Sequence, residues 1–181
     1  MWVIDNPGTV GGSMSAEAVR TFEDSLDRLD VEWTHTSREE FAATLSAVVE
    51  GPTVGVDLPF EGVSLSDTDV TVDPTAAALE AATTGVTAAR MGIADYGSVV
   101  LGSTPEGAEA VSLFVDHHVV VVRSEDVVPG MREAFTEFGP WLREGGDTAI
   151  IATGPSATAD MGELVKGAHG PKTVRVVILD E

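Results

Sequence analysis

The segment 148–170 has the residue types of a small-anion binding loop. Residues 148–152 predict a buried strand, followed by a glycine–proline turn and by a short predicted helix at about 158–165. Backbone N–H groups at the start of a helix favour phosphates and carboxylates at the carboxyl edge of a sheet. The candidate ligand-binding residues of this segment are Gly154, Ser156, Thr158, Asp160 and Gly170. An ordinary helix cap, with Asp160 complementing the helix dipole, explains the same pattern equally well.

A histidine follows this predicted helix. His169 lies between Gly167 and Gly170, in a tight loop before the final strand, where its ring can face a ligand. A loop histidine that bonds a nearby carbonyl is the plainer interpretation. His117 and His118 are adjacent in a predicted strand, so their rings point to opposite faces and cannot chelate one metal. We expect no metal site, since no paired-histidine or clustered-carboxylate pattern supports one.

The segment 83–98 is rich in small and polar residues, with three threonines, three glycines and one arginine. Glycine and threonine allow a small ligand to approach the backbone, and Arg90 can give a bidentate contact to an anion. Thr87 and Ser98 are the candidate ligand-binding residues here. Asp95 is, with His169, a candidate catalytic acid or base; the alternative is that it caps the next turn.

Together these two segments resemble the LUD-domain family. The motifs that carry the resemblance are Gly85-Val86-Thr87, Ile93-Ala94-Asp95-x-Gly97-Ser98, Gly154-Pro155-Ser156-x-Thr158-Ala159-Asp160 and His169-Gly170-Pro171. They span roughly 69–179, and the last two motifs are the most specific. This sequence has Ala157 where the family often has arginine, so any anion contact of that arginine must come from elsewhere here.

The resemblance implies an α/β fold related to sugar-phosphate isomerases, glucosamine-phosphate deaminases and coenzyme A transferases. It also implies a role in oxidising lactate to pyruvate in the cytoplasm, beside iron–sulfur proteins and a second LUD-bearing protein. The chain is then an accessory or substrate-handling component that takes a small anionic ligand. One alternative is a stand-alone isomerase, transferase or cyclo-ligase acting on a small phosphate or carboxylate compound; another is a pure scaffold. The resemblance carries over no established catalytic residues.

Length and composition bound these interpretations. The sequence has 181 residues, 43% of them hydrophobic, which is enough for one domain with a substantial core. No apolar run is long enough to span a bilayer, and residues 1–13 show no secretory signal pattern. Because the sequence has no cysteine, it excludes cysteine-ligated iron–sulfur clusters in this chain, and such clusters are expected only in partners.

The charge is strongly acidic, with 30 acidic residues against 10 basic ones and a net charge of −20. Such a surface repels nucleic acids and anionic membranes, so neither is expected as a partner. The even spread of acid and the scarcity of lysine favour adaptation to a salt-rich cytoplasm, where the screening length is about 3 Å at 1 M salt. A docking face for a basic partner is the alternative. Under the salt interpretation the unfolding midpoint rises steeply from low to molar potassium chloride.

Helices and strands alternate along the chain. Helices are predicted at about 15–29, 37–49, 74–82 and 124–143, and strands at 31–35, 53–57, 70–72, 98–101, 118–122, 148–152 and 174–179. This alternation predicts a single α/β domain with a mostly parallel sheet flanked by helices. Its parts are an extension at 1–13 before Met14 (a candidate start), a helical part at 14–68 and a best-matching core at 69–180. We expect one crevice at the carboxyl ends of the strands, lined by Thr87, Asp95, Ser98, Ser156, Thr158 and His169.

Overall fold

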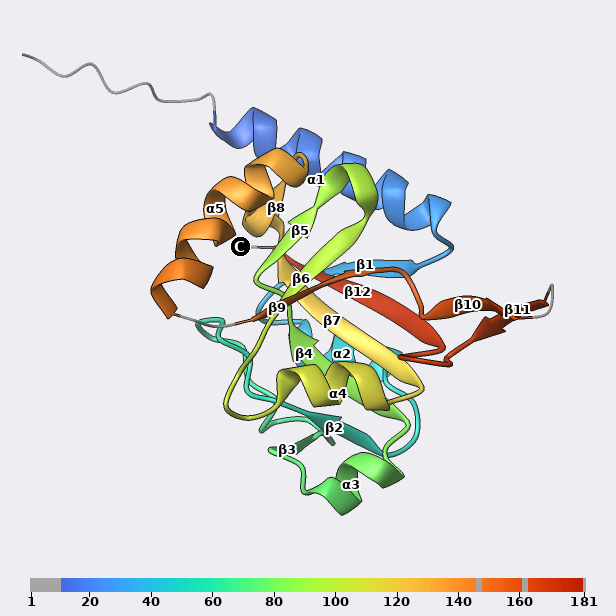
Figure 1. Ribbon diagram of the computed structural model, residues 1–181. Coiled ribbons are helices and arrows are strands. Elements are labelled where there is room, and N and C mark those ends of the chain that lie inside the picture. The colour runs from blue at the N-terminus through green and yellow to red at the C-terminus, as the bar shows by residue number, and fades with distance from the viewer. Residues whose placement is uncertain (1–10, 146–147, 161–162, 181) are drawn as a thin grey trace, which may run out of the picture.

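The computed structural model of the protein describes residues 11–145, 148–160 and 163–180. Within these ranges the chain forms three sheets, with helices packed against the largest (Figure 1). The predicted α/β fold with a mostly parallel sheet flanked by helices is confirmed. Of the predicted extension, residues 1–10 lie outside the described residues, and 11–13 begin the first helix. None of the helices in the described part is long and apolar enough to cross a membrane.

The main sheet has the strand order β1-β12-β7-β4-β2-β3, and every neighbouring pair in it is parallel. Its strands are β1 (Glu32–Thr36), β12 (Thr173–Leu179), β7 (His117–Arg123), β4 (Thr84–Ala88), β2 (Thr53–Gly55) and β3 (Thr71–Val72). The four valines at 119–122 of β7 are all fully buried. They make β7 a strand covered on both faces, as its unbroken apolar run predicts.

The two faces of the main sheet pack against different helices. On one face, Val120 packs with α1 (Gly11–Arg28) around the buried ring of Phe22. On the other face, Val119 packs with α2 (Phe41–Val48). Because successive side chains of a strand point to opposite faces, one run of valines serves both cores.

A second sheet lies over the α1 face and has the order β8-β5-β6-β9. Its strands are β8 (Val127–Val128), β5 (Met91–Ile93), β6 (Ser98–Gly102) and β9 (Ala149–Thr153). The 3-10 helices η1 (Ala94–Tyr96) and η2 (Ser124–Asp126) lead into β6 and β8. β6 pairs antiparallel with both β5 and β9. The strands predicted at 98–101 and 148–152 are therefore present, but they form this sheet and not the parallel one.

The remaining helices are α3 (Ala76–Ala81), α4 (Ala108–Phe114) and α5 (Met131–Gly145). α3 begins after Thr75, whose hydroxyl oxygen accepts from the N–H of Ala78 at 3.2 Å, and not after Asp73 as predicted. α5 begins later than predicted because η2 and β8 take up 124–128. It continues through Pro140, since a proline removes a hydrogen bond without always ending a helix.

The helix predicted at 158–165 is wrong. β10 (Ala157–Asp160) and β11 (Glu163–Lys166) form an antiparallel hairpin that projects from the body of the molecule (Figure 1). Thr158 pairs with Val165 across it. β-Branched side chains and a glycine at 162 disfavour so short a helix, and strand pairing prevails. No helix dipole therefore contributes to the loop at Gly154.

The glycine- and threonine-rich segment 83–98 contains β4, a strand that the sequence pattern did not predict. A Cβ atom on Gly85 would lie 2.5 Å from the carbonyl oxygen of Val111, so this glycine lets α4 pack closely on β4. Thr84 and Thr87 are fully buried. At this point the small residues let a helix pack closely on the strand.

Candidate functional site

A cavity of about 330 Å³ lies between the main sheet and the second sheet. We call it the motif cavity, because two of the sequence motifs meet at it. Its polar end is formed by Gly154, Pro155, Ser156, His169, Gly170 and Pro171. The two loops are joined by a backbone hydrogen bond in which the N–H of Ser156 donates to the carbonyl of Pro171 at 2.9 Å. The structure thus brings together the two most specific of the motifs that carried the family resemblance.

The motif cavity lies at the amino ends of β7 and β12, not at the carboxyl ends as predicted. His118, the second residue of β7, and Pro171, just before β12, both line it. The prediction placed β9 in the parallel sheet. Because β9 pairs antiparallel in the second sheet, the loop at its end reaches the opposite edge of the main sheet.

His118 forms part of the floor of the cavity and is 2% exposed. Its Nε2 lies 2.8 Å from the hydroxyl oxygen of Thr87, which is fully buried. Among the described residues this hydroxyl has no other hydrogen-bond partner, so its proton is satisfied by donation to Nε2. The neutral ring then carries its own proton on Nδ1.

The Nδ1 atom of His118 is open to the cavity. In the described part of the chain, every fully buried polar side-chain atom has a hydrogen-bond partner. Nδ1 has no such partner there, so it is not fully buried, and His118 lines the cavity. Burial, together with the neighbouring His117, lowers the pKa of His118 to about 4. At neutral pH the ring is therefore an uncharged N–H donor.

His117 points to the opposite face, as predicted from its position beside His118. Its Nδ1 lies 2.8 Å from the hydroxyl of Thr173, and its Nε2 lies 3.2 Å from the carbonyl oxygen of Val48. Both ring nitrogens thus have partners within the core. No group of metal-binding side chains occurs among the residues that the structure describes.

Ser156 and His169 add two further polar groups to the cavity. Within 11–145, 148–160 and 163–180, neither side chain has a hydrogen-bond partner. A Cβ atom on Gly170 would lie 3.1 Å from the Cβ of Ser156, so glycine lets the His169 loop approach the Ser156 loop. The hydroxyl and the ring remain available to a ligand.

Apart from Ser112 and Thr153, the rest of the cavity wall is apolar. It is formed largely by Leu26, Leu101, Ile150 and Val176. No acidic side chain is among its lining residues in the described part of the chain. In a protein with a net charge of −20, this cavity therefore presents no negative side chain to an anion.

The other predicted site residues lie in different places. Ser98 is buried, and its hydroxyl lies 2.7 Å from that of Thr153, which joins β6 to β9 beside the cavity. Thr158 lies in β10 and does not line the cavity. The backbone of Asp160 belongs to β10, but its side chain lies outside the described residues.

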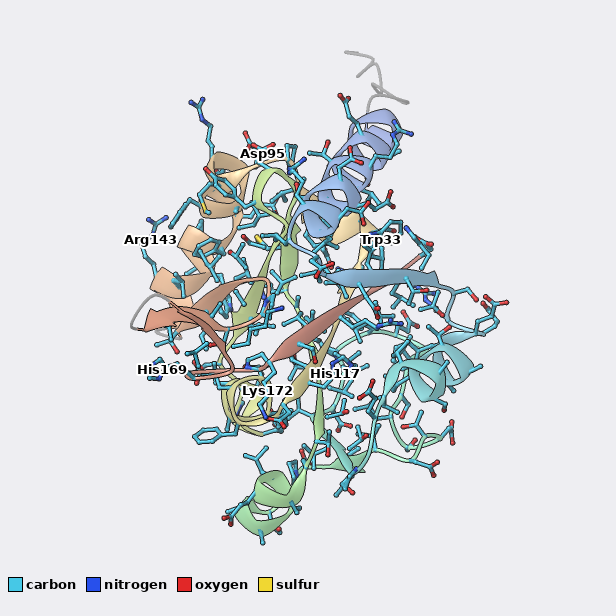
Figure 2. All side chains as sticks on the ribbon, turned by 90° about the vertical axis from the view of Figure 1, so that its right-hand side faces the viewer. Trp33, Asp95, His117, Arg143, His169 and Lys172 are labelled. Carbon is cyan, nitrogen blue, oxygen red and sulfur yellow. The ribbon has the colours of Figure 1, made fainter. Side chains whose placement is uncertain are left out.

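Asp95 does not share the cavity with His169. It is exposed in η1, its N–H donates to the carbonyl of Pro129, and its carboxylate lies against Gly130. Figure 2 shows Asp95 and His169 at well-separated places in the molecule. The two candidate acid–base residues therefore cannot act together on one small ligand.

His118 is the residue that sequence reasoning missed. Its partner Thr87 is 31 positions away, so no local spacing connects them. The available signal was a histidine beginning a run of four valines. A polar ring in such a strand needs a buried partner or a ligand.

The fold and the motif cavity define an α/β protein in which Gly-Pro-Ser and His-Gly-Pro loops meet beside a buried histidine. The family model described as LUD domain matches residues 4–179. The chain belongs to the LUD domain family, as the motifs indicated.

Two similar proteins carry the name lactate utilization protein C. The one from Deinococcus radiodurans is 28% identical over 181 residues, which cover 91% of this chain and 80% of that protein. The one from Bacillus licheniformis is 29% identical over 128 residues, 68% of this chain. The chain spans 53% of that second protein's length.

A crystal structure of a DUF162 family protein from Deinococcus radiodurans has the same fold. Its TM-score is 0.70 at 24% sequence identity, and the match covers 91% of this chain and 98% of that one. The likeness extends over nearly the whole arrangement of elements described above.

Proposed function

We propose that this protein is an accessory or substrate-handling component of a cytoplasmic system that oxidises L-lactate to pyruvate. Its similarity to proteins named for lactate utilisation supports this role. In this proposal the motif cavity binds a small 2-hydroxy- or 2-oxocarboxylate.

One observation carries the proposal. Three residues that line the motif cavity each carry a polar group without a hydrogen-bond partner among the described residues, and these groups are the Nδ1 of His118, the hydroxyl of Ser156 and the ring of His169. N–H and O–H donors suit the oxygens of a carboxylate and of a hydroxyl or keto group. The apolar wall suits the methyl group that lactate and pyruvate both carry.

The partners are those that the resemblance to the LUD-domain family implies, namely iron–sulfur proteins and a second LUD-bearing protein. Oxidation of a 2-hydroxy acid to a 2-oxo acid releases two electrons, and this sequence has no cysteine with which to ligate an iron–sulfur cluster. We infer that the partners accept those electrons. Neighbouring genes that encode a cysteine-rich protein and a second LUD protein would support this arrangement.

A stand-alone enzyme of the isomerase, transferase or cyclo-ligase type is the second candidate. It is favoured by the same groups, since a hydroxyl and two imidazole rings beside one cavity can also exchange protons. Turnover of a small phosphate or carboxylate compound by the purified protein without partners would select this alternative.

The binding test uses isothermal titration calorimetry of the purified protein with L-lactate and with pyruvate. We expect one of the two acids to bind, and Ser156→Ala to weaken its affinity about tenfold, because one charge-assisted hydrogen bond is lost. Ser46→Ala is the matched control. The hydroxyl of Ser46 donates to the carbonyl of Ala42 on the surface of α2, away from the cavity.

The ligand assignment is wrong if neither acid binds, or if Ser156→Ala binds as tightly as the unchanged protein. The cellular role is tested separately. A strain that lacks the gene should grow poorly on L-lactate and recover with the unchanged gene. Normal growth of the deletion strain would contradict the role in lactate utilisation.

A further inference from the structure

A second and larger hollow lies at the other end of the main sheet. It has a volume of about 760 Å³ and is lined by residues just beyond the ends of β2 and β4 and by the last residue of β7. We call it the arginine groove, after Arg90 and Arg123, which both line it. The carboxyl ends of parallel strands are where open α/β sheets hold their ligands. None of the residues proposed above for the motif cavity lines this groove.

The two arginines of the groove differ in what holds them. Arg123 makes a two-pronged ion pair with Asp126, at 2.6 and 2.9 Å, and a further ion pair with Glu125. Arg90 has no carboxylate partner among the described residues. It is exposed, and its guanidinium lies 4.5 Å from the centre of the Trp141 ring.

Trp141 holds Arg90 in a defined orientation. A Cβ atom on Gly102 would lie 3.2 Å from the indole, so the ring packs directly on the backbone of β6. A guanidinium stacked on a fixed aromatic face keeps its N–H edge free and already oriented. Less side-chain entropy is then lost when that edge binds an oxyanion.

The hydroxyl of Thr104 is a second donor at the groove. Its oxygen accepts from the N–H of Ala108 at 3.2 Å, which leaves its O–H proton to donate. The groove also contains Asp57, Glu106 and Glu137. Anion binding there consequently depends on the directed donors of Arg90, and molar salt that screens the carboxylates favours it.

We propose that the arginine groove is a second binding site, which takes an organic molecule bearing a phosphate or a carboxylate through the free edge of Arg90. Its volume is more than a three-carbon acid needs and is in the range of larger organic ligands. The site is independent of the lactate role proposed above, since it shares no lining residue with the motif cavity.

The test reads the fluorescence of Trp141. The sequence has three tryptophans, and the double variant Trp2→Phe, Trp33→Phe leaves only the one in the groove. Titrations in 1 M potassium chloride use two probes, pyrophosphate for a phosphate ligand and succinate for a carboxylate ligand. We expect one probe to give a saturable change, and Arg90→Gln to weaken its affinity at least about tenfold. Arg90→Lys keeps the charge but loses the planar guanidinium, so its affinity for the probe should lie between those of the parent and of Arg90→Gln.

Arg132→Gln is the matched control, because Arg132 is an exposed arginine of α5 that does not line the groove. Calorimetry on the unmodified chain repeats the measurement without the tryptophan changes. The probe that binds identifies the class of ligand. The proposal is overturned if neither probe binds by either method, if Arg90→Gln has no effect, or if Arg132→Gln weakens binding equally.

Discussion

The motif cavity and the arginine groove lie at opposite ends of β7. β7 begins beside the cavity with His118 and ends at the groove with Arg123. β4 supports the cavity through Thr87, and its chain continues to Arg90 at the groove. The cavity is small, largely apolar and equipped with neutral donors, whereas the groove is larger and carries guanidinium groups.

The comparison shows that strand direction and sequence motif identify different places. The carboxyl-edge rule for parallel sheets leads to the groove. The Gly-Pro-Ser and His-Gly-Pro motifs lead to the cavity, because the antiparallel strand β9 carries the first of them to the amino edge. Each region therefore needs its own test.

The largest expected effect concerns the buried ring at the cavity. The folded-state pKa of His118 is lowered to about 4, so between pH 6.5 and about 4 the unfolded chain binds a proton at this ring and the folded chain does not. The resulting stability is fully present above pH 6.5 and is lost as pH falls from about 6.5 to about 4. Over that window the unchanged protein should lose roughly 3 kcal/mol more unfolding free energy than His118→Gln.

Urea unfolding at a series of pH values measures this difference. Thr87→Val serves as a companion, because it removes the hydroxyl that Nε2 accepts from and should cost about 1–3 kcal/mol at neutral pH. Parallel pH profiles of the unchanged protein and His118→Gln would show that the ring is not buried in its neutral form.

The next largest effect concerns Gly85 in β4, the strand that contains Thr87 and leads to Arg90. Gly85→Ala places a Cβ 2.5 Å from the carbonyl oxygen of Val111 and should destabilise the protein by about 1–3 kcal/mol, because α4 must move off β4. Gly139→Ala is the matched control. A Cβ there meets nothing within 4 Å, and alanine in a helix should stabilise by up to about 1 kcal/mol. Equal unfolding midpoints for both variants would refute the close packing at Gly85.

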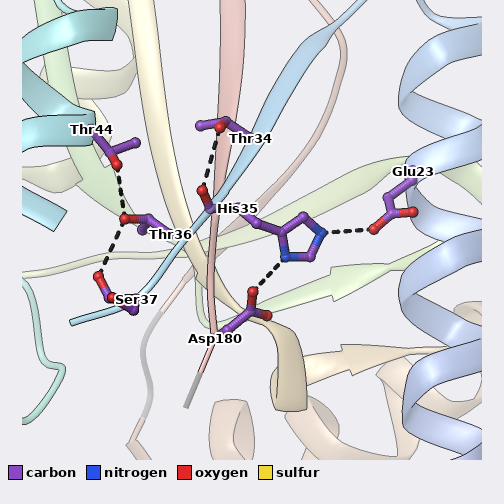
Figure 3. Close-up of polar contacts among 7 residues, drawn as sticks. All are labelled: Glu23, Thr34, His35, Thr36, Ser37, Thr44 and Asp180. Carbon is purple, nitrogen blue, oxygen red and sulfur yellow. Dashed lines mark hydrogen bonds and ion pairs between the residues drawn. The ribbon is translucent and has the colours of Figure 1, made fainter. Parts of the chain in front are cut away.

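The smallest effect has the opposite pH dependence. His35 bridges α1 and the end of β12, with Nε2 2.8 Å from Glu23 and Nδ1 2.7 Å from Asp180 (Figure 3). Burial alone would lower the pKa of His35, but the hydrogen bonds and charges of Glu23 and Asp180 outweigh it and raise the pKa. The stabilisation that the charged His35 ring gives the fold is fully present below pH 6.5 and is lost as pH rises through the raised pKa of this ring.

Because this ring is partly exposed, solvent screening limits the contribution to below about 1 kcal/mol. Replacement by glutamine, His35→Gln, should lower the unfolding midpoint at pH 5.5 and leave it nearly unchanged at pH 9. A midpoint that falls more at pH 9 than at pH 5.5 would reverse the sign and reject the bridge.

Local patterns in the sequence were sufficient for the elements that pack through their own periodicity. The stripe that contains Phe22 predicted α1, and the four valines predicted β7. β4 and the hairpin at 157–166 were not predicted. In both, pairing with distant or adjacent strands overrides a segment whose composition is small and polar.

Only part of the candidate site was predicted, because the rest depends on contacts between residues that are distant in the sequence. The motifs indicated that Ser156 and His169 belong together, and the structure places both at the motif cavity. The role of His118 depends on a tertiary contact with Thr87. Asp95 was included in the predicted site because its motif directly precedes β6 in the sequence. Which end of a sheet a loop reaches is set by the pairing of its strand, which short-range patterns do not encode.

A crystal structure of the protein soaked with L-lactate tests the central claim most directly. We expect density for the acid in the motif cavity, with an oxygen within hydrogen-bond distance of the Ser156 hydroxyl or of Nδ1 of His118. Lactate seated against Arg90 in the arginine groove, with the motif cavity holding only water, would contradict it.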